Sequence, residues 1–397
     1  MRSTGSAVKA VIRYRRPDPE CWEAVVKAAC NPLGSSWDAA KTVAQAGPAV
    51  SVHADRLARA LATRLGNVGE LAVALAGTGD LRALPVLRRI AEDNRVPFHV
   101  PWVSHLSALP VAELLPTMRA VLRQGPTRYH ASICTLELLA QWGPDSAPAV
   151  PEVVPYLEGP YAYGALRVLG RIGPAAAVAA DRLADFATGR APQAARHHPR
   201  LAAWAHWRVT GDPTLALDVC GAAVGSGTAS HGLPFLADLG PLAAAHADTV
   251  RGLMESPGAW TRVAAAHAYA RITGDAEPAM AVLLAEVDPD WTGNPALPTR
   301  EAVRRLGGIG APAAAAAPLL RRILAAEERL SHPYEQVRIL ADEAYVRTLT
   351  GALDRIDASA APGRGDRVPA SAATVPPARR GLPARWRGPR TAGRPRS

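Results

Sequence analysis

A turn closed by glycine recurs along most of this 397-residue chain, and its spacing constrains the fold more than any single motif. Each closing glycine directly follows a segment in which apolar residues stand three and four positions apart. The closing glycines are Gly47, Gly79, Gly143, Gly173, Gly211, Gly240, Gly274, Gly310 and Gly351. A turn without glycine, at Pro110, fills the largest gap, and the mean spacing is then about 34 residues. Such a period is typical of stacked helical units that bury their apolar faces against their neighbours.

Two of these turns share the spelling Thr-Gly-Asp, at residues 210–212 and 273–275. Glycine ends a helix because it adopts the left-handed conformation without steric cost. The aspartate that follows suits a cap, because its carboxylate accepts hydrogen bonds from the free backbone N–H groups of the next helix. We therefore interpret Asp212 and Asp275 as structural caps and not as catalytic carboxylates.

Each unit is expected to contain two antiparallel helices. The first follows the turn, as in residues 174–187 and 311–328, and the second precedes the next turn, as in residues 161–173 and 300–310. Runs of alternating β-branched residues, which would indicate strands, are almost absent. The sequence therefore predicts an all-α fold, a right-handed α-solenoid of about nine to ten antiparallel helix pairs.

The segments ALRVLGRIGPAAAVAADRL and AVRRLGGIGAPAAAAAPLL resemble HEAT repeats, in particular the short HEAT-like repeats also found in phycobilisome lyases. The resemblance covers roughly residues 40–351. It implies a helical-repeat architecture and does not identify an activity. Ankyrin repeats fit less well because their Thr-Pro-Leu-His turn is absent. Tetratricopeptide repeats also fit less well, because three Phe and eight Tyr are too few for the large aromatics those units use.

Three regions are predicted. Residues 1–40 form an N-terminal arm, which carries the basic run 13–16, and a capping helix from Pro19 to Cys30. Residues 41–357 form the HEAT-like repeat solenoid. Residues 358–397, rich in Pro, Gly, Ala and Arg, cannot bury enough apolar surface to fold and are predicted to form a disordered basic tail.

The positive charge is unevenly distributed. The tail holds nine Arg and a single acid, Asp366, so it carries +8 of the net charge of +10 and leaves the rest of the chain near +2. No apolar run is long enough to span a membrane, and the four cysteines are scattered without a Cys-x-x-Cys pair. These features predict a soluble, cytoplasmic protein with reduced cysteines.

A search for catalytic chemistry finds no recognisable set of residues. The paired His197 and His198 lack a nearby acid at ligand spacing, and no His-Glu-x-x-His motif occurs. The residues Asp288, Asp290 and Asn294 match a calcium loop only loosely. Signatures of a nucleophilic serine and of a phosphate-binding loop are also missing. We therefore expect no enzyme activity, no cofactor, no metal and no small-molecule substrate.

The expected function is that of a scaffold or adaptor that binds a protein partner on its extended helical surface. Second helices usually line the concave face of HEAT-like proteins, and this resemblance places the partner-binding residues on them: Trp204, Arg208, His267, Arg271 and Arg304. The alternative is a nucleic-acid-binding protein that grips its ligand as HEAT-like DNA glycosylases do, through this basic stripe and the basic tail. The near-neutral charge of residues 1–357 disfavours the alternative, because few phosphates would be neutralised.

Overall fold

The computed structural model describes residues 3–31, 36–63, 66–97, 100–126, 129–190, 198–226, 231–332 and 335–360. The chain divides into two units, residues 1–360 and 361–397. The second unit contains nearly all of the predicted tail and lies outside the described residues, as does His197. The last helix of the first unit continues to Ala360, so the first three residues of the predicted tail are helical.

The described part of the first unit is all-α, and its only β-type pairing is an isolated bridge between Tyr14 and Glu328. The α-helices are α1 (Thr4–Arg13), α2 (Pro19–Ala29), α3 (Trp37–Gln45), α4 (Ala54–Thr63), α5 (Val68–Gly77), α6 (Leu84–Glu92), α7 (Trp102–Leu106), α8 (Val111–Arg123), α9 (Tyr129–Trp142), α10 (Val150–Val153), α11 (Ala162–Ile172), α12 (Ala180–Ala187), α13 (Pro199–Thr210), α14 (Thr214–Gly225), α15 (Leu233–Leu239), α16 (Ala247–Gly252), α17 (Ala259–Thr273), α18 (Glu277–Ala285), α19 (Thr299–Ile309), α20 (Ala317–Leu324) and α21 (Arg338–Ala360). The 3₁₀ helices are η1 (Gly47–His53), η2 (Leu81–Ala83), η3 (Gly143–Ala149), η4 (Val154–Glu158), η5 (Gly173–Ala179), η8 (Gly240–His246), η9 (Leu253–Glu255), η10 (Ala311–Ala316) and η11 (Glu335–Val337).

The predicted closing glycines end helices at all positions but one. Every one of them except Gly351 has a positive φ, as in Gly211 (φ 81°) and Gly274 (φ 78°). The caps are confirmed as well, because Asp212 accepts a hydrogen bond from the Thr214 backbone N–H at 3.0 Å and Asp275 accepts one from Glu277 at 3.1 Å. The Thr-Gly-Asp turns are thus corners between helices.

The prediction for Gly351 is wrong. This glycine lies inside α21, a helix of 23 residues, because neither of the next two residues, Ala352 and Leu353, is a proline or an aspartate that would stop the helix. Helices form over most of the predicted ranges 174–187 and 311–328, but neither is a single α-helix and α20 already ends at Leu324. Each begins as a 3₁₀ segment, η5 or η10, and only then continues as α12 or α20. The backbone of Ala176 (φ −96°, ψ 19°) marks such a kink.

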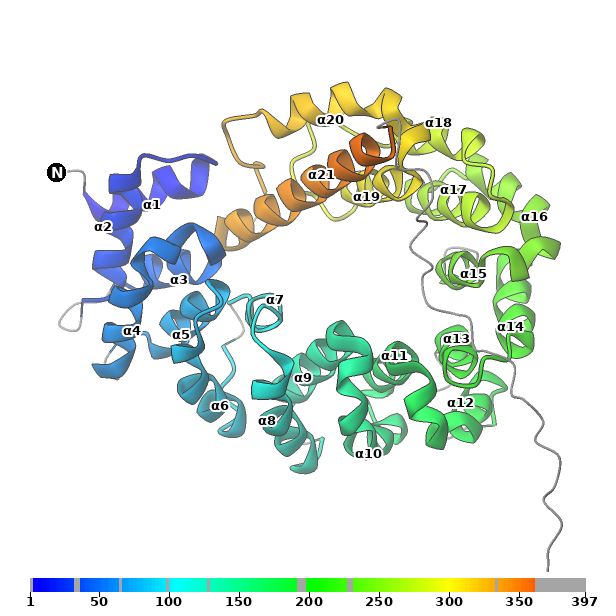
Figure 1. The fold of residues 1–397 in the computed structure, drawn as a ribbon, viewed down its shortest axis with the longest axis horizontal. Helices are drawn as coiled ribbons and strands as arrows, with labels where there is room; N and C mark the ends of the chain where they lie inside the picture. Colours follow the sequence, from blue (N-terminus) through cyan, green and yellow to red (C-terminus); the bar gives the residue numbers. More distant parts are fainter. Residues whose placement is uncertain are drawn as a thin grey trace, which may run out of the picture. The chain divides into compact units, whose positions relative to one another are not determined.

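The helices that precede the turns pack on one another in chain order. The successive contacts run α3–α5–α7–α9–α11–α13–α15–α17–α19–α21, and we call this set the inner helices. They bury a continuous apolar core in which large and small side chains alternate, with Leu169 above Ala165 and Leu306 above Ala302. Figure 1 shows the outer helices, among them α4, α6, α8, α10 and α12, on the other side of this core.

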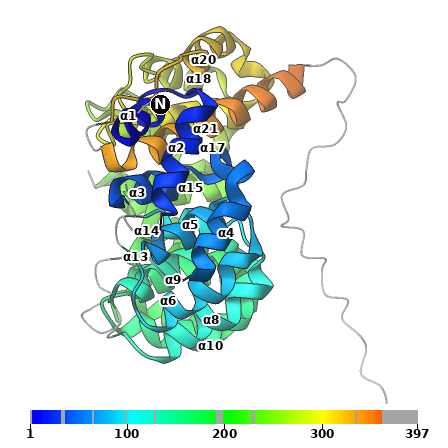
Figure 2. The same ribbon diagram turned by 90° about the vertical axis from the view of Figure 1, so that its left-hand side faces the viewer.

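The first and last helices of this unit are in contact. Helix α21 packs against both α1 and α3, and Figures 1 and 2 show these elements side by side. The expectation of a separate N-terminal arm is corrected here. Residues 4–13 form α1, and arginines of the basic run 13–16 bond to residues of the last helical repeat. Arg13 pairs with Glu328, and Arg15 pairs with Asp342 at 2.9 Å. The series of contacts between inner helices therefore returns to its start, because the last of them, α21, contacts the first, α3.

Candidate binding surface

The five residues expected to bind a partner lie on three inner helices. Trp204 and Arg208 belong to α13, His267 and Arg271 to α17, and Arg304 to α19. Their surroundings differ so much that they do not form one uniform surface.

Trp204 is a packing residue. Its side chain is 4% exposed, and its Nε1 donates a hydrogen bond to Asp238 of α15 at 3.0 Å. The ring lies on Gly170 of α11, where an added Cβ atom would stand 2.2 Å from the Trp204 Cζ3 atom. The Arg171 guanidinium lies 5.7 Å from the ring centroid. Trp204 therefore joins three inner helices and offers little surface to a partner, contrary to the expectation.

His267 and Arg304 are both engaged within the protein. Arg305 lies 3.0 Å from the His267 Nε2 atom, through its Nη1 atom. Burial and the nearby charges of Arg305, Arg271 and Arg304 lower the pKa of His267 to about 3, so the ring is neutral at physiological pH. Arg304 is exposed but forms an ion pair with Glu301, one turn away on α19.

Arg208 and Arg271 are exposed, and the structure adds Arg171 as their equivalent. Each of the three lies near the C-terminal end of an inner helix. Its backbone carbonyl lies close to the closing glycine of a neighbouring inner helix. A Cβ atom built on that glycine would lie 3.4–3.5 Å from the carbonyl oxygen, for the pairs Gly143–Arg171, Gly173–Arg208 and Gly240–Arg271. Within the described residues, none of the three arginines forms an ion pair. We call Arg171, Arg208 and Arg271 the arginine row.

The sequence pattern missed Arg171 because Arg208 and Arg271 stand three residues before their glycines, whereas Arg171 stands two before Gly173. This difference in the position of the arginine accompanies a difference in the turn that follows the helix. Gly173 is followed by a 3₁₀ helix, whereas Gly211 is followed by an aspartate cap. Asp238 of α15 occupies the place between Arg208 and Arg271, so the row contains one acidic position.

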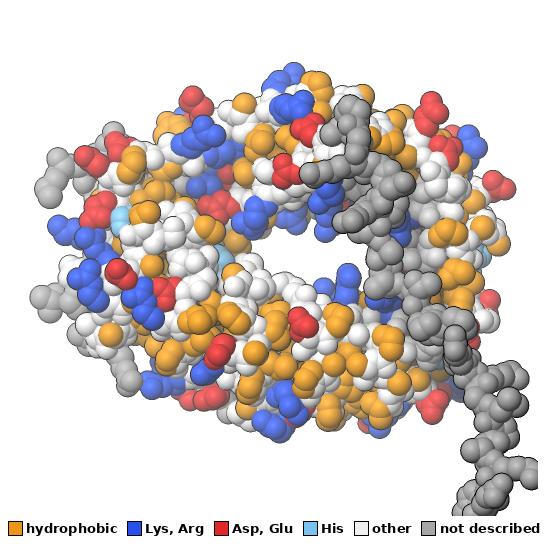
Figure 3. Space-filling model, in the orientation of Figure 1, with side chains coloured by type: hydrophobic (Ala, Val, Ile, Leu, Met, Phe, Trp, Pro, Cys, Tyr) orange, Lys and Arg blue, Asp and Glu red, His pale blue; other side chains and the backbone are white. Residues whose placement is uncertain are grey.

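A second cationic site lies between α19 and α21. A hollow of about 290 Å³ is lined by Arg300 and Arg304 of α19 and by Arg347, Thr348, Gly351 and Arg355 of α21. We call it the arginine hollow. Figure 3 shows Lys and Arg side chains gathered over α19 and α21 and again over α11 on the facing side of the inner helices.

An aromatic groove lies between α9 and α11. It measures about 200 Å³ and includes Tyr129 and Tyr163, which are 64% and 51% exposed. The Arg167 guanidinium lies 5.7 Å from the Tyr163 ring centroid. The third tyrosine, Tyr161, is buried and donates its hydroxyl to the Pro126 carbonyl at 2.8 Å. We call this site the tyrosine groove. No sequence signal pointed to it, because Tyr129 and Tyr163 come from different units.

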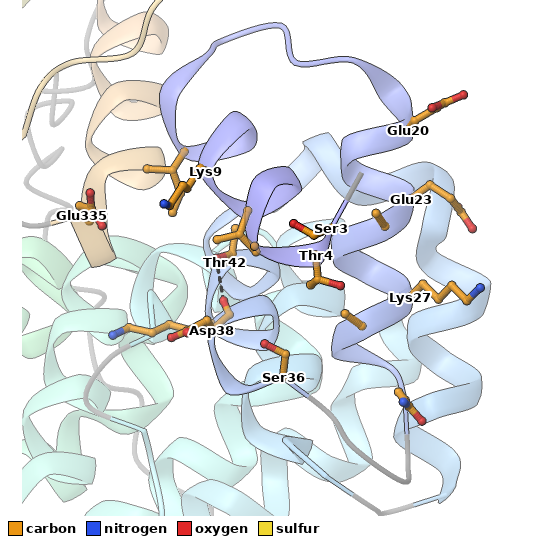
Figure 4. Close-up of a pocket in the computed structure, with 17 residues that line it drawn as sticks. Ser3, Thr4, Lys9, Glu20, Glu23, Lys27, Ser36, Asp38, Thr42 and Glu335 are labelled. Carbon is orange, nitrogen blue, oxygen red and sulfur yellow. Dashed lines mark hydrogen bonds between the residues drawn. The ribbon is translucent and has the colours of Figure 1, made fainter. Parts of the chain in front are cut away.

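A larger hollow, about 1520 Å³, lies among α1, α2 and α3. All three lysines of the chain, Lys9, Lys27 and Lys41, line it. Figure 4 shows that its charged side chains diverge, with Lys27, Glu20 and Glu23 directed away from Lys9. Lys41 instead lies 4.5 Å from the Trp37 ring centroid. These charged groups do not converge on one point, so they are not placed to act together on one bound molecule.

Burial keeps three of the four thiols protonated. Burial raises the pKa of Cys30 to about 11 and the pKa values of Cys134 and Cys220 to about 12. In the ranges that the structure describes, no three His, Cys, Asp or Glu side chains cluster as a metal site requires. The same ranges contain no helix with both the length and the apolar character to cross a membrane.

Comparison with known proteins adds no family to this description. The chain matches none of the protein families searched, and no curated protein is similar to it in sequence.

Proposed function

We propose that this protein is a non-enzymatic scaffold or adaptor, built as a right-handed HEAT-like solenoid of about nine to ten helix pairs. The regular succession of inner helices and the positive φ of their closing glycines support the repeat architecture. The four free cysteines support a cytoplasmic location, where thiols stay reduced.

The proposed ligand is a protein partner with an acidic surface. The observation that carries this proposal is the tyrosine groove, which is lined by two tyrosines more than half exposed and by Arg167, whose guanidinium lies over the Tyr163 ring. Tyr and Arg are the residue types enriched at the centres of protein interfaces, because they combine a large apolar area with hydrogen-bonding groups. Arg171 belongs to the same helix as Tyr163, so the groove adjoins the arginine row.

The test is affinity capture from the native organism with the full chain and with Y129A/Y163A. We expect the double variant to lose the captured partner, with binding weakened about tenfold or more if both rings are central to the interface. The matched control is V178A/L242A, which truncates two exposed apolar side chains in the 3₁₀ turns. Equal capture by all three proteins would rule out the groove as the site.

The second candidate function is nucleic-acid binding, which is favoured by the arginine hollow. Guanidinium groups match phosphate geometry, and phosphate contacts supply most of the sequence-independent affinity for nucleic acids. The nine arginines of residues 358–397 add to this charge. Nuclease treatment before capture distinguishes the two functions, because only partners held through nucleic acid are then lost.

A further inference from the structure

The arginine hollow has a charge that its own surroundings do not balance. Four guanidinium groups line about 290 Å³, and no carboxylate is among its described lining residues. Arg304 pairs with Glu301 at its edge, and the Arg355 Nε donates to the Gly307 carbonyl at 3.1 Å. Arg300 and Arg347 have no ion pair within the described residues. The hollow therefore presents two exposed arginines without an ion pair to solvent, although Arg347 interacts electrostatically with Glu343, one turn away on α21.

The two helices hold these cations close together. Helices α19 and α21 approach so tightly that a Cβ atom on Gly307 would lie 2.6 Å from the Ala352 Cα atom. Burial, together with the charges of Arg305 and Arg300, lowers the pKa of Arg304, so the neighbouring cations add to the cost of its charge. A bound anion would lower that cost.

Gly351 leaves room for such an anion. It lies in the middle of α21 without a turn to explain it, and a Cβ atom there would stand 3.7 Å from the Arg355 Nη1 atom. A glycine in a helix interior destabilises the helix relative to alanine by about 1 kcal/mol. At this position it keeps the wall of the hollow free of a side chain.

We propose that the arginine hollow binds a phosphate group of a nucleic-acid strand. Guanidinium groups from two helices can donate to different oxygens of one phosphate from two sides. The extended ligand is favoured over a free phosphate because exposed arginines continue along α11, α13 and α17. This inference rests on the second candidate function.

The test measures binding of a labelled single-stranded 20-mer of thymidine to the full chain by fluorescence anisotropy, from 50 to 200 mM salt. The variant is R300Q/R347Q, which removes the two cations without an ion pair. We expect its dissociation constant to rise about tenfold. The slope of log affinity against log salt should fall by about 0.7, the value for one lost phosphate contact on a single strand.

The matched control is R89Q/R322Q, which removes two exposed arginines from the outer helices α6 and α20. It should bind within about twofold of the unaltered chain. Pyrophosphate should compete with the oligonucleotide on the unaltered chain and lose this effect on R300Q/R347Q. A polyglutamate peptide of equal charge should compete at least about tenfold less well. Circular dichroism checks that both variants keep their helices.

Several results would overturn the proposal, and they have different meanings. If the unaltered chain binds no oligonucleotide, the proposed nucleic-acid function is wrong, and so is the proposed phosphate site in the arginine hollow. If the chain binds the oligonucleotide but R300Q/R347Q binds it equally well, only the assignment of the arginine hollow as the phosphate site is wrong, and the oligonucleotide binds elsewhere on the protein. Equal weakening of both variants indicates general charge attraction without a site. Equal competition by polyglutamate assigns the hollow to an acidic protein segment.

Discussion

Two kinds of interface hold the first unit together, and they use opposite chemistry. Between neighbouring inner helices the contact is apolar and close, as where Trp204 lies on Gly170 or where α21 meets Gly307. Where the last helices meet the first, the contact is polar. The Arg15 Nη2 atom donates to Asp342 at 2.9 Å, and the Arg329 Nη1 atom donates to the same carboxylate at 3.3 Å.

The closing interface is also tied through its backbone. The Arg15 backbone N–H donates to the Glu327 carbonyl at 2.9 Å, and the Arg329 N–H donates to the Arg13 carbonyl at 2.8 Å. The Arg329 Nε reaches the carbonyls of Val11 and Tyr14. A repeated apolar seam fits any neighbouring unit, whereas this set of charges fits a single partner segment. The difference suggests that packing supplies the stability of the units and the polar contacts select which ends meet.

The largest effect is expected from Asp342→Ala at the closing interface. The Asp342 carboxylate is fully buried, and the Arg329 side chain is 3% exposed, so the change leaves Arg329 buried without its main anion. Breaking a buried pair in this way costs about 3–5 kcal/mol. Urea denaturation checks the loss, and hydrogen exchange should show new opening of α1 and α21. If exchange of α1 stays unchanged, the closing interface does not depend on this carboxylate.

A pH dependence of nearly the same size is expected from Glu343 beside that carboxylate. Burial, opposed by Arg329 and Arg347, raises the pKa of Glu343 to about 7. Because the pKa is raised in the folded state, the stabilising contribution is complete below the unfolded pKa near 4.5. It is lost as pH rises through about 7, a change of roughly 3 kcal/mol.

The Glu343→Gln variant isolates this contribution, since it keeps the size of the side chain and removes its titration. The difference in unfolding free energy between the variant and the unaltered chain should grow in favour of the variant from pH 4.5 to 8. A difference that stays constant over this range would show that Glu343 titrates normally.

The inner-helix interface is tested by Gly307→Ala. The added methyl would lie 2.6 Å from the Ala352 Cα atom, so α19 and α21 must separate. Overpacking of this kind costs about 1–3 kcal/mol. The adjacent Gly308→Ala is the control, because a Cβ atom there meets nothing within 4 Å and the helix should gain up to about 1 kcal/mol. Similar melting temperatures for the two variants would contradict the close approach.

The smallest effect is expected at a corner between units. Asp275→Ala removes the acceptor for the Glu277 N–H and should lower stability by about 1 kcal/mol, since only one cap is lost. Asp275→Asn, itself a good cap, should restore most of it, and neither change should alter partner binding. A loss of binding in the Asn variant at unchanged melting temperature would make Asp275 functional.

Local features of this chain followed directly from its residues. The helix ends at Gly211 and Gly274, the caps at Asp212 and Asp275 and the helix that begins at Pro19 depend on interactions within a few positions. The arginines of α13 and α17 were found in the same way, because a helix that repeats carries its surface residues at a repeated offset.

The tertiary structure alone decided what lies opposite those residues. It buried Trp204 on a glycine of another unit, neutralised His267 beside Arg305, and turned Gly351 from an expected corner into the wall of the arginine hollow. It also joined Arg15 to Asp342, across more than three hundred residues. Such pairings depend on how units stack and curve, which is set by the sum of many packing contacts and leaves no signal at either position in the sequence.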